Sequence, residues 1–380
     1  MTPTAVSSVY VHAPFCVRRC PYCDFAVQVR RVGDVEGWLA ALAGELRAVE
    51  REGLFVAADR IRTVYVGGGT PSLLGPTAME GVAALLGRER LGDALEEWTA
   101  EANPESLTKS VAAAWRRAGV DRLSIGIQSF HEPTLRWMGR RHGAEGAEMA
   151  VRVARAAGFE NLSVDLIFAL PASTGRSWRD DLERTLALDA PHVSLYGLSV
   201  EPATPLGRAV AEGREHPVDE ERYREEYLEA VAALEGAGYV HYEVSNFARP
   251  GWEAVHNSVY WDGSPYLGLG NGAHSFAPPV RRWNVRDWNT YRERTLLDRS
   301  PEESREVVTD GAEALEAIWL GLRTRRGLSE EGLGTSGAAL AAAWEARGLA
   351  TRNDGRVRLT AEGWVVLDHL VVELSEVVAP

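Results

Sequence analysis

The stretch Tyr10-Val-His-Ala-Pro-Phe-Cys16-Val-Arg-Arg-Cys20-Pro-Tyr-Cys23 holds all three cysteines of this 380-residue chain. Cysteines that serve only packing would be scattered, whereas three thiols in one short loop indicate a metal site. Arg18 and Arg19 lie between them, and their positive charge is expected to favour the thiolate form. Loops that bind iron–sulfur clusters usually supply four thiolates. Three thiolates would leave one iron of a [4Fe–4S] cluster open to another ligand.

Three cysteines in one loop could also have other roles. A disulfide framework is disfavoured, because the number of cysteines is odd and the chain is long enough to bury a large core. Structural zinc would need a fourth ligand, and His12 could supply it, because three cysteines and one histidine form an accepted zinc set. Inert buried thiols are a further alternative. The sequence spacing favours a cluster but leaves these two alternatives open.

Length, composition and charge indicate the broad class of protein. Hydrophobic residues make up 45% of the chain and charged residues 25%, as in ordinary globular proteins. The length favours two domains. The net charge of −13 at pH 7 disfavours a general nucleic-acid binder. Neither a signal peptide nor an apolar run of the ~18 residues needed to span a membrane is evident. We therefore expect a cytoplasmic protein, because an oxygen-sensitive cluster needs a reducing compartment.

Short β-rich runs alternate with helical patterns over the first half of the chain. A helix is predicted over 35–52, with Asp34 as its N-cap and Gly53 as its stop. Six strand–helix units imply parallel strands with right-handed crossovers, which suits a doubly wound sheet or an open barrel. The strands are predicted at 8–12, 61–66, 97–101, 122–127, 162–168 and 192–196, and the other helices at 77–86, 110–118, 144–157 and 178–188.

The strand–helix alternation ends near residue 201, where prolines and glycines mark a connector. A helix is predicted over 220–235, and the sequence that follows is β-rich up to residue 277. Further on, the tight-turn signal Asn353-Asp354-Gly355 lies among predicted helices at 311–322, 338–347 and from about residue 361. Helices with a small hairpin resemble a winged helix. The acidic balance favours a lid or packing role for this domain over DNA binding.

The cysteine loop, with Cys-x₃-Cys-x₂-Cys spacing after His-x-Pro-Phe, resembles the signature of radical S-adenosylmethionine (SAM) enzymes. Within that superfamily it resembles the oxygen-independent coproporphyrinogen III oxidase-like family. True dehydrogenases of that family have a fourth cysteine where this chain has Phe25. The Cys-Asp-Phe ending instead resembles the haem chaperone branch, HemW. The resemblance implies an α/β fold with a partial (β/α)₆ barrel at 1–205, a connector and β-rich extension closing it at 206–300, and a winged-helix-like domain at 301–380.

A glycine-rich turn and several polar residues follow the predicted strands. The turn Gly67-Gly68-Gly69-Thr70-Pro71 is weak evidence alone, because ordinary tight turns use glycine and the ending of a P-loop is absent. Each polar residue alone could be a capping or surface group, and Asp165, within an apolar run, could be a buried carboxylate held by hydrogen bonds. Ligands of barrels, however, bind at the carboxyl ends of strands, and the resemblance implies that this set contacts SAM. The set is Tyr10, Gly67, Gly68, Gly69, Thr70, Glu101, Gln128, Arg140 and Asp165.

The segment His256-Asn-Ser-Val-Tyr260-Trp261 is a second distinctive motif. By itself, a histidine in an aromatic-rich strand is most often a hydrogen-bonded core residue. The resemblance implies haem binding, with His256 as an axial ligand and the two aromatic rings against the porphyrin. The alternative is a structural strand that closes the barrel. His274, near the SAM pocket by resemblance, stands where the dehydrogenases have an apolar residue.

Three functions follow from the resemblance. A haem chaperone would bind a [4Fe–4S] cluster through Cys16, Cys20 and Cys23, together with SAM and haem, and would pass haem to an apoprotein such as a membrane-associated respiratory protein. A coproporphyrinogen III dehydrogenase would cleave SAM and decarboxylate propionates. A third candidate is a radical enzyme acting on another tetrapyrrole. Phe25 and the motif at His256 favour the chaperone.

Overall fold

The computed structural model describes residues 3–378, and its main body is an open, mostly parallel sheet. Six parallel strands form its centre, and each begins and ends within two residues of the predicted bounds. They are β2 (Ser8–Ala13), β6 (Thr63–Gly68), β7 (Glu97–Ala102), β8 (Arg122–Gln128), β9 (Asn161–Phe168) and β10 (His192–Gly197).

Three short strands extend this sheet at its two edges. They are β11 (Val240–Glu243), β12 (Asn246–Ala248) and β13 (Leu267–Leu269). The strand order within the described residues is β11-β12-β10-β9-β8-β7-β6-β2-β13. β12 runs antiparallel to β10, and β13 runs parallel to β2. Because β11 and β13 lie at opposite ends of this order, the sheet does not close on itself, and the predicted partial barrel is confirmed.

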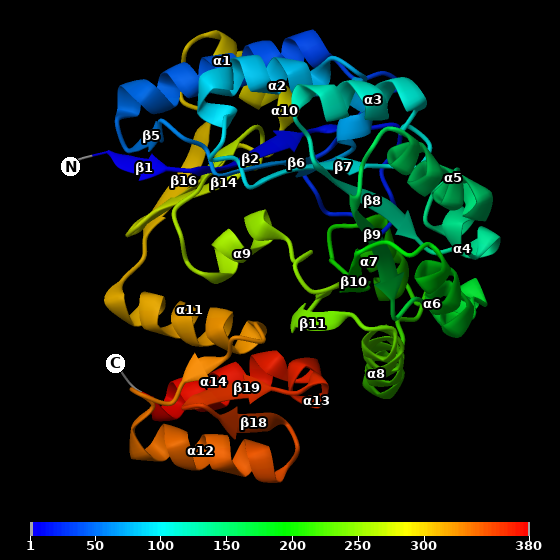
Figure 1. Cartoon of the computed structure of the whole chain (residues 1–380), viewed down its shortest axis with the longest axis vertical. Coiled ribbons are helices and arrows are strands. Elements are labelled where there is room, and N and C mark those ends of the chain that lie inside the picture. The colour runs from blue at the N-terminus through cyan, green and yellow to red at the C-terminus, as the bar shows by residue number, and fades with distance from the viewer. Residues whose placement is uncertain (1–2, 379–380) are drawn as a thin grey trace.

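Helices connect the parallel strands, and α1, α2 and α3 lie side by side over one face of the sheet (Figure 1). Their bounds follow from local capping. Asp34 accepts a hydrogen bond from the Gly37 amide at 2.9 Å, and Gly53, with φ of 67°, ends α1. The helices of this part are α1 (Val35–Glu52), α2 (Ala78–Leu86), α3 (Lys109–Ala118), α4 (Glu132–Trp137), α5 (Gly143–Ala156), α6 (Trp178–Ala187), α7 (Pro205–Ala211) and α8 (Glu220–Gly236).

The segment after α8 is less β-rich than the sequence predicted. The motif at His256 forms helix α9 (Val255–Trp261) instead of a strand, and that prediction was wrong. The reason is a distant cap, because the Glu97 carboxylate accepts the amide hydrogens of Val255 at 3.0 Å and His256 at 2.9 Å. No local pattern reveals a cap supplied by a strand far away in the sequence.

The remaining secondary structure of the extension was also unpredicted in detail. A three-stranded antiparallel sheet follows β13, and one helix packs on α1. These elements are β14 (His274–Ala277), β15 (Val280–Asn284), α10 (Trp288–Leu296) and β16 (Glu302–Val307). Two short parallel pairs near the N-terminus join β1 (Thr4–Val6) to β5 (Phe55–Ala57) and β3 (Phe15–Cys16) to β4 (Gln28–Val29).

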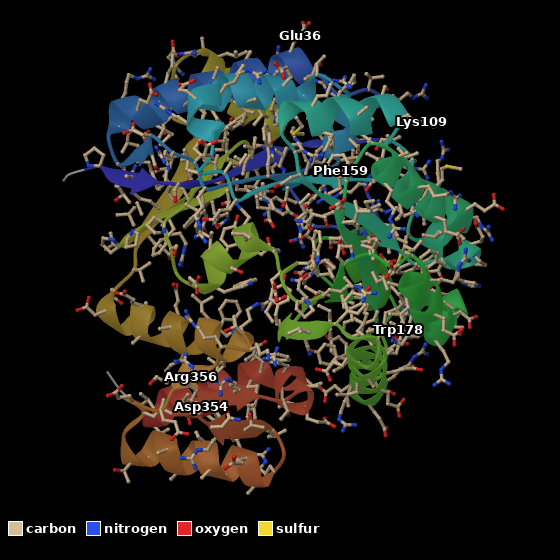
Figure 2. All side chains as sticks on the ribbon, in the orientation of Figure 1. Glu36, Lys109, Phe159, Trp178, Asp354 and Arg356 are labelled. Carbon is tan, nitrogen blue, oxygen red and sulfur yellow. The ribbon has the colours of Figure 1, made fainter. Side chains whose placement is uncertain are left out.

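The C-terminal domain has the helix–strand–helix–hairpin–helix order of a winged helix. Asp354 and Arg356 lie at its hairpin (Figure 2), and the indole of Trp364 donates to the Leu322 carbonyl at 2.9 Å. The elements are α11 (Asp310–Arg323), β17 (Leu328–Ser329), α12 (Gly334–Ala346), β18 (Ala350–Asn353), β19 (Arg356–Leu359), α13 (Ala361–Val365) and α14 (Leu367–Val377). The three-way division at residues 205 and 300 stays a prediction.

Residues 3–378 include no helix that is both long and apolar enough to cross a lipid bilayer.

Candidate functional site

The cysteine loop and the carboxyl ends of the parallel strands enclose a cavity of about 450 Å³, here called the inner cavity. All three cysteines line it, and none is in a disulfide. Most of the predicted SAM contacts line it as well, namely Gly68, Gly69, Thr70, Glu101, Gln128, Arg140 and Asp165. Tyr10 lies in the wall of an adjoining groove, and Gly67 lines neither space. Folding therefore brings together residues that are more than one hundred positions apart in the sequence.

The cysteine loop is held by backbone hydrogen bonds at its start and by a turn within it. Cys16 lies in β3, which pairs with β4, and its carbonyl accepts the Arg30 amide at 2.8 Å. The Cys23 amide donates to the Cys20 carbonyl at 3.2 Å, which closes a turn. The Cys16 Sγ lies 3.4 Å from Thr70 Oγ1, so the loop contacts the glycine-rich turn directly. The loop is thus fixed against the strand ends on which a ligand would rest.

A mononuclear zinc site with His12 as fourth ligand does not fit this geometry. The His12 Nε2–H donates to the Ala26 carbonyl at 2.9 Å, so Nδ1 accepts from the Tyr10 hydroxyl at 3.1 Å. Both ring nitrogens are therefore engaged. Within residues 3–378, no three histidine, cysteine or acidic side chains converge on one metal ion. A [4Fe–4S] cluster does not need such convergence, because each thiolate binds a different iron.

The expectation that Arg18 and Arg19 would favour the thiolate is wrong for Cys16. Burial raises the pKa of the Cys16 thiol to about 11, and a hydrogen bond from Thr70 only partly opposes this effect. Burial also raises the pKa of Cys23, against a smaller opposing effect of Arg19. For Cys16, neither arginine is among the groups that act on the thiol appreciably, so their charge does not offset desolvation. Ligation by a metal centre, which deprotonates a thiol outright, is the stronger source of the thiolate form.

Glu101 connects the glycine-rich turn to β7. Its carboxylate accepts the Tyr65 hydroxyl at 2.8 Å and the Gly68 amide at 2.9 Å. Burial raises the pKa of Glu101 to about 7, although both hydrogen bonds act in the opposite direction. Gly68 has φ of 109°, and a Cβ atom there would overlap the His12 ring. This position therefore requires glycine, both for its backbone angle and for its close contact.

The wall of the inner cavity contains polar atoms that lack a partner within the described residues. Gln128 Oε1 and Arg140 Nε are buried and make no hydrogen bond there. Gln128 also has φ of 71°, a strained angle for a residue with a side chain. Arg140 is held by a 2.6 Å hydrogen bond from Nη1 to Asn103 Oδ1. One free acceptor and one free donor in a buried wall are suited to contact a polar ligand.

Asp165 lies inside β9 with its carboxylate held by neighbouring serines. The Ser124 hydroxyl lies 2.9 and 3.0 Å from its two oxygens, and burial raises the Asp165 pKa. Sequence reasoning missed Ser124, and it also missed Tyr65 and Asn103, which position Glu101 and Arg140. The available signal was a polar residue within an otherwise apolar strand. That signal is weak, because many buried serines and tyrosines only satisfy backbone groups.

His256 lies outside the inner cavity and is fully buried in α9. Its Nδ1 is 2.8 Å from Thr63 Oγ1, and its Nε2 is 2.9 Å from the Tyr260 hydroxyl. Burial lowers its pKa to about 3. Haem ligation by His256 stays a prediction, and it would require one of these hydrogen bonds to break. Trp261 also has a partner, because the Arg323 guanidinium lies 4.3 Å from its ring centre.

The amino-acid sequence of this chain is similar to those of several known proteins. A model of the radical SAM superfamily matches residues 10–185. The chain is 38% identical over 371 residues to the heme chaperone HemW of Mycobacterium tuberculosis, covering 96% of this chain and 93% of that protein. It is 35% identical over 328 residues to the heme chaperone HemW of Lactococcus lactis, covering 86% and 83% of the two chains.

Among solved structures, coproporphyrinogen III oxidase (HemN) from Escherichia coli, described as a radical SAM enzyme, superposes with a TM-score of 0.80. The superposition covers 98% of this chain and 91% of that one, at 22% sequence identity. Similarity at that identity establishes the shared fold alone. The predicted α/β fold with a radical SAM barrel and a smaller C-terminal domain is confirmed.

Proposed function

This chain belongs to the HemW family of the radical SAM superfamily, and from that premise we propose that it is a haem chaperone that holds a [4Fe–4S] cluster, SAM and haem. The observation that carries the cluster and SAM is the inner cavity, whose wall combines three free thiols with buried polar atoms that have no partner among residues 3–378. The haem assignment rests on the names of the relatives and on Phe25, which occupies the position of a fourth cysteine in the dehydrogenases.

The residues of the inner cavity suit the two cofactors by their chemistry. We infer that Cys16, Cys20 and Cys23 are the thiolate ligands, which leaves one iron for the amino and carboxylate groups of SAM. When bound, the reduced cluster would supply an electron to the SAM sulfonium. The backbone of Gly68 and Gly69 allows close approach of a ligand, and Arg140 offers a donor to a carboxylate. Glu101, Asp165 and Gln128 offer acceptors to hydroxyl and amino groups.

The partners and the location form part of the same proposal. A haem chaperone delivers its ligand to an apoprotein, and a membrane-associated respiratory protein is the recipient that we propose. The cytoplasm is the proposed location, because a solvent-accessible cluster needs a reducing compartment. Phe25 disfavours decarboxylation of coproporphyrinogen III, since the loop lacks the fourth cysteine of the dehydrogenases.

The proposal is tested on the full chain after anaerobic reconstitution with iron and sulfide. We expect about four irons per chain, as one [4Fe–4S] cluster requires, spectrophotometric saturation with ferric haem, and transfer of that haem to an apo-globin acceptor. A parallel sample receives coproporphyrinogen III, SAM and a reductant, and we expect no protoporphyrinogen IX. Formation of protoporphyrinogen IX with consumption of SAM would establish a dehydrogenase instead. Recovery of one zinc without iron–sulfur absorbance would refute the cluster.

A further inference from the structure

A second space adjoins the inner cavity and is here called the outer groove. Its volume is about 420 Å³, within the range of sites that hold small molecules and cofactors. It lies between the end of the cysteine loop, helix α9 and the start of β14. Asp24, Phe25, Gly68 and Glu101 border both spaces. The groove is therefore continuous with the cofactor site but has side chains of its own.

Aromatic rings form much of the wall of the outer groove, which the acidic residues Asp24 and Glu101 also line. Tyr260 and Tyr266 meet edge to face with ring centres 4.8 Å apart, and both line the groove. Phe25 lines it as well, with 56% of its surface exposed. An exposed phenylalanine beside two tyrosine rings favours a ligand with a large apolar face. Phe25 is also the residue that distinguishes this loop from that of the dehydrogenases.

His274 is the histidine of this groove that is available for a ligand. Its exposed ring stacks on Trp283, with ring centres 5.7 Å apart and an interplanar angle of 24°. Across residues 3–378, neither of its ring nitrogens has a hydrogen-bond partner. The other histidine of the groove, His12, has both ring nitrogens engaged, and so does His256 behind the wall. Partial burial and nearby Arg281 and Arg286 lower the pKa of His274, which favours the neutral imidazole.

Arg286 adds a cation to the same groove. Its guanidinium donates to the Asp24 carbonyl and makes no ion pair with any acidic side chain of the described residues. An arginine without a carboxylate partner suits an anionic group of a ligand. The groove thus combines an apolar aromatic wall, a neutral imidazole and an unpaired cation. Haem combines the matching features, namely a flat apolar ring, an iron that binds imidazole, and two propionates.

We propose that haem binds in the outer groove, with His274 as an axial iron ligand and Arg286 beside a propionate. This inference rests on the proposed function. His256 is then a positioning residue. Its Nε2 holds the Tyr260 hydroxyl at 2.9 Å and so fixes the aromatic wall, while its Nδ1 is held by Thr63. The motif on α9 contributes to haem binding through Tyr260, whose ring lines the groove.

The test uses the full chain with two probes, ferric haem and iron-free protoporphyrin IX. The variants are His274→Ala and His256→Ala, and the matched control is His369→Ala, an exposed histidine on α14. Haem binding is followed by its Soret band and by electron paramagnetic resonance, and porphyrin binding by fluorescence quenching. Thermal melting monitored by circular dichroism verifies that each variant is folded. Alanine at 274 should be tolerated, because the side chain is exposed and contacts Trp283 at the surface.

We expect His274→Ala to shift the Soret band and to weaken haem binding by about tenfold or more, which corresponds to ~1.4 kcal/mol. Its affinity for iron-free porphyrin should stay unchanged, and added imidazole should restore the Soret band. His256→Ala should keep the iron ligand but weaken the binding of both probes, because the wall loses its support. His369→Ala should match the wild-type protein in both assays.

The outcomes separate this inference from the proposed function. A wild-type protein that binds no haem would refute the haem chaperone itself. A wild-type protein that binds haem, together with a His274→Ala variant of unchanged spectrum and affinity, would overturn only the assignment of the ligand. Loss of the ligand spectrum in His256→Ala, with iron-free porphyrin bound normally, would assign the iron to His256 instead.

Discussion

Replacement of Gly68 by alanine tests how the glycine-rich turn supports both the fold and the site. Gly68 ends β6 with φ of 109°, and its amide donates to Glu101 at 2.9 Å. An added Cβ atom would overlap the His12 ring. That ring is buried and is held by hydrogen bonds to the Ala26 carbonyl and the Tyr10 hydroxyl, so it has little freedom to move away.

The expected cost has two parts. A residue with a side chain at a left-handed backbone angle costs about 1–2 kcal/mol. Displacing His12 would break or weaken two hydrogen bonds, each with a net contribution of about 1 kcal/mol. The sum, about 3–4 kcal/mol, lowers the folding equilibrium constant by roughly two to three orders of magnitude. The added methyl group and the displaced ring would also reduce the space in which a ligand can approach the backbone of Gly68. The affinity for SAM should therefore fall as well.

The measurement compares Gly68→Ala with Gly53→Ala in urea denaturation and in equilibrium dialysis of SAM. Gly53 ends α1 with φ of 67°, and a Cβ atom there meets nothing within 4 Å. It therefore isolates the backbone cost and should leave SAM binding intact. If the two variants lost equal free energy of unfolding, the contact with His12 would not be a real constraint. If Gly68→Ala bound SAM as the wild type does, the turn would not belong to the site.

Further predictions concern the cluster and two buried ionic groups. Iron–sulfur absorbance and cluster-dependent SAM binding should be lost in each of the single variants Cys16→Ala, Cys20→Ala and Cys23→Ala. The thermal unfolding transition of the iron-free chain should stay in place, because none of these side chains belongs to the core. Burial raises the pKa of Glu45 to about 7, so folding is favoured by the protonated carboxyl, and this contribution to stability is lost as the pH rises from about 4.5 through 7. Glu45→Gln should therefore flatten the pH dependence of the unfolding free energy over this range. An unchanged slope would contradict the assignment. Arg176 is buried between Asp181 and Glu226, so Arg176→Met should lower the unfolding free energy by about 3–5 kcal/mol, whereas the exposed control Arg179→Ala should have almost no effect in the same denaturation series.

The sequence predicted those elements whose signals are local. Helix α1 begins and ends where Asp34 and Gly53 place it, because a cap is formed by residues next to the helix. The cysteine loop and the strand-end residues were also predicted, since their meaning depends on spacing and on the parallel topology. Helix caps and motif spacing can both be recognised in a single sequence without knowledge of distant contacts.

The elements that were missed depend on distant contacts. Helix α9 takes its N-terminal cap from Glu97 in β7, so the His256 segment by itself gave no sign of a helix. The protonation of Cys16 depends on burial, which a pattern of neighbouring arginines does not report. The distinction between His256 and His274 also required coordinates, because only the hydrogen bonds of each ring show which nitrogen is engaged.

Gly68 and Glu101 line both the inner cavity and the outer groove, and this shared wall has a thermodynamic consequence. A ligand in either space would therefore lie against the same Glu101 carboxylate, which accepts the Gly68 amide. If occupancy on one side changes affinity on the other by some factor, the reverse effect must equal it, since the two binding free energies belong to one closed cycle. Titrating either ligand in the presence of the other would therefore measure a single interaction free energy from two independent directions.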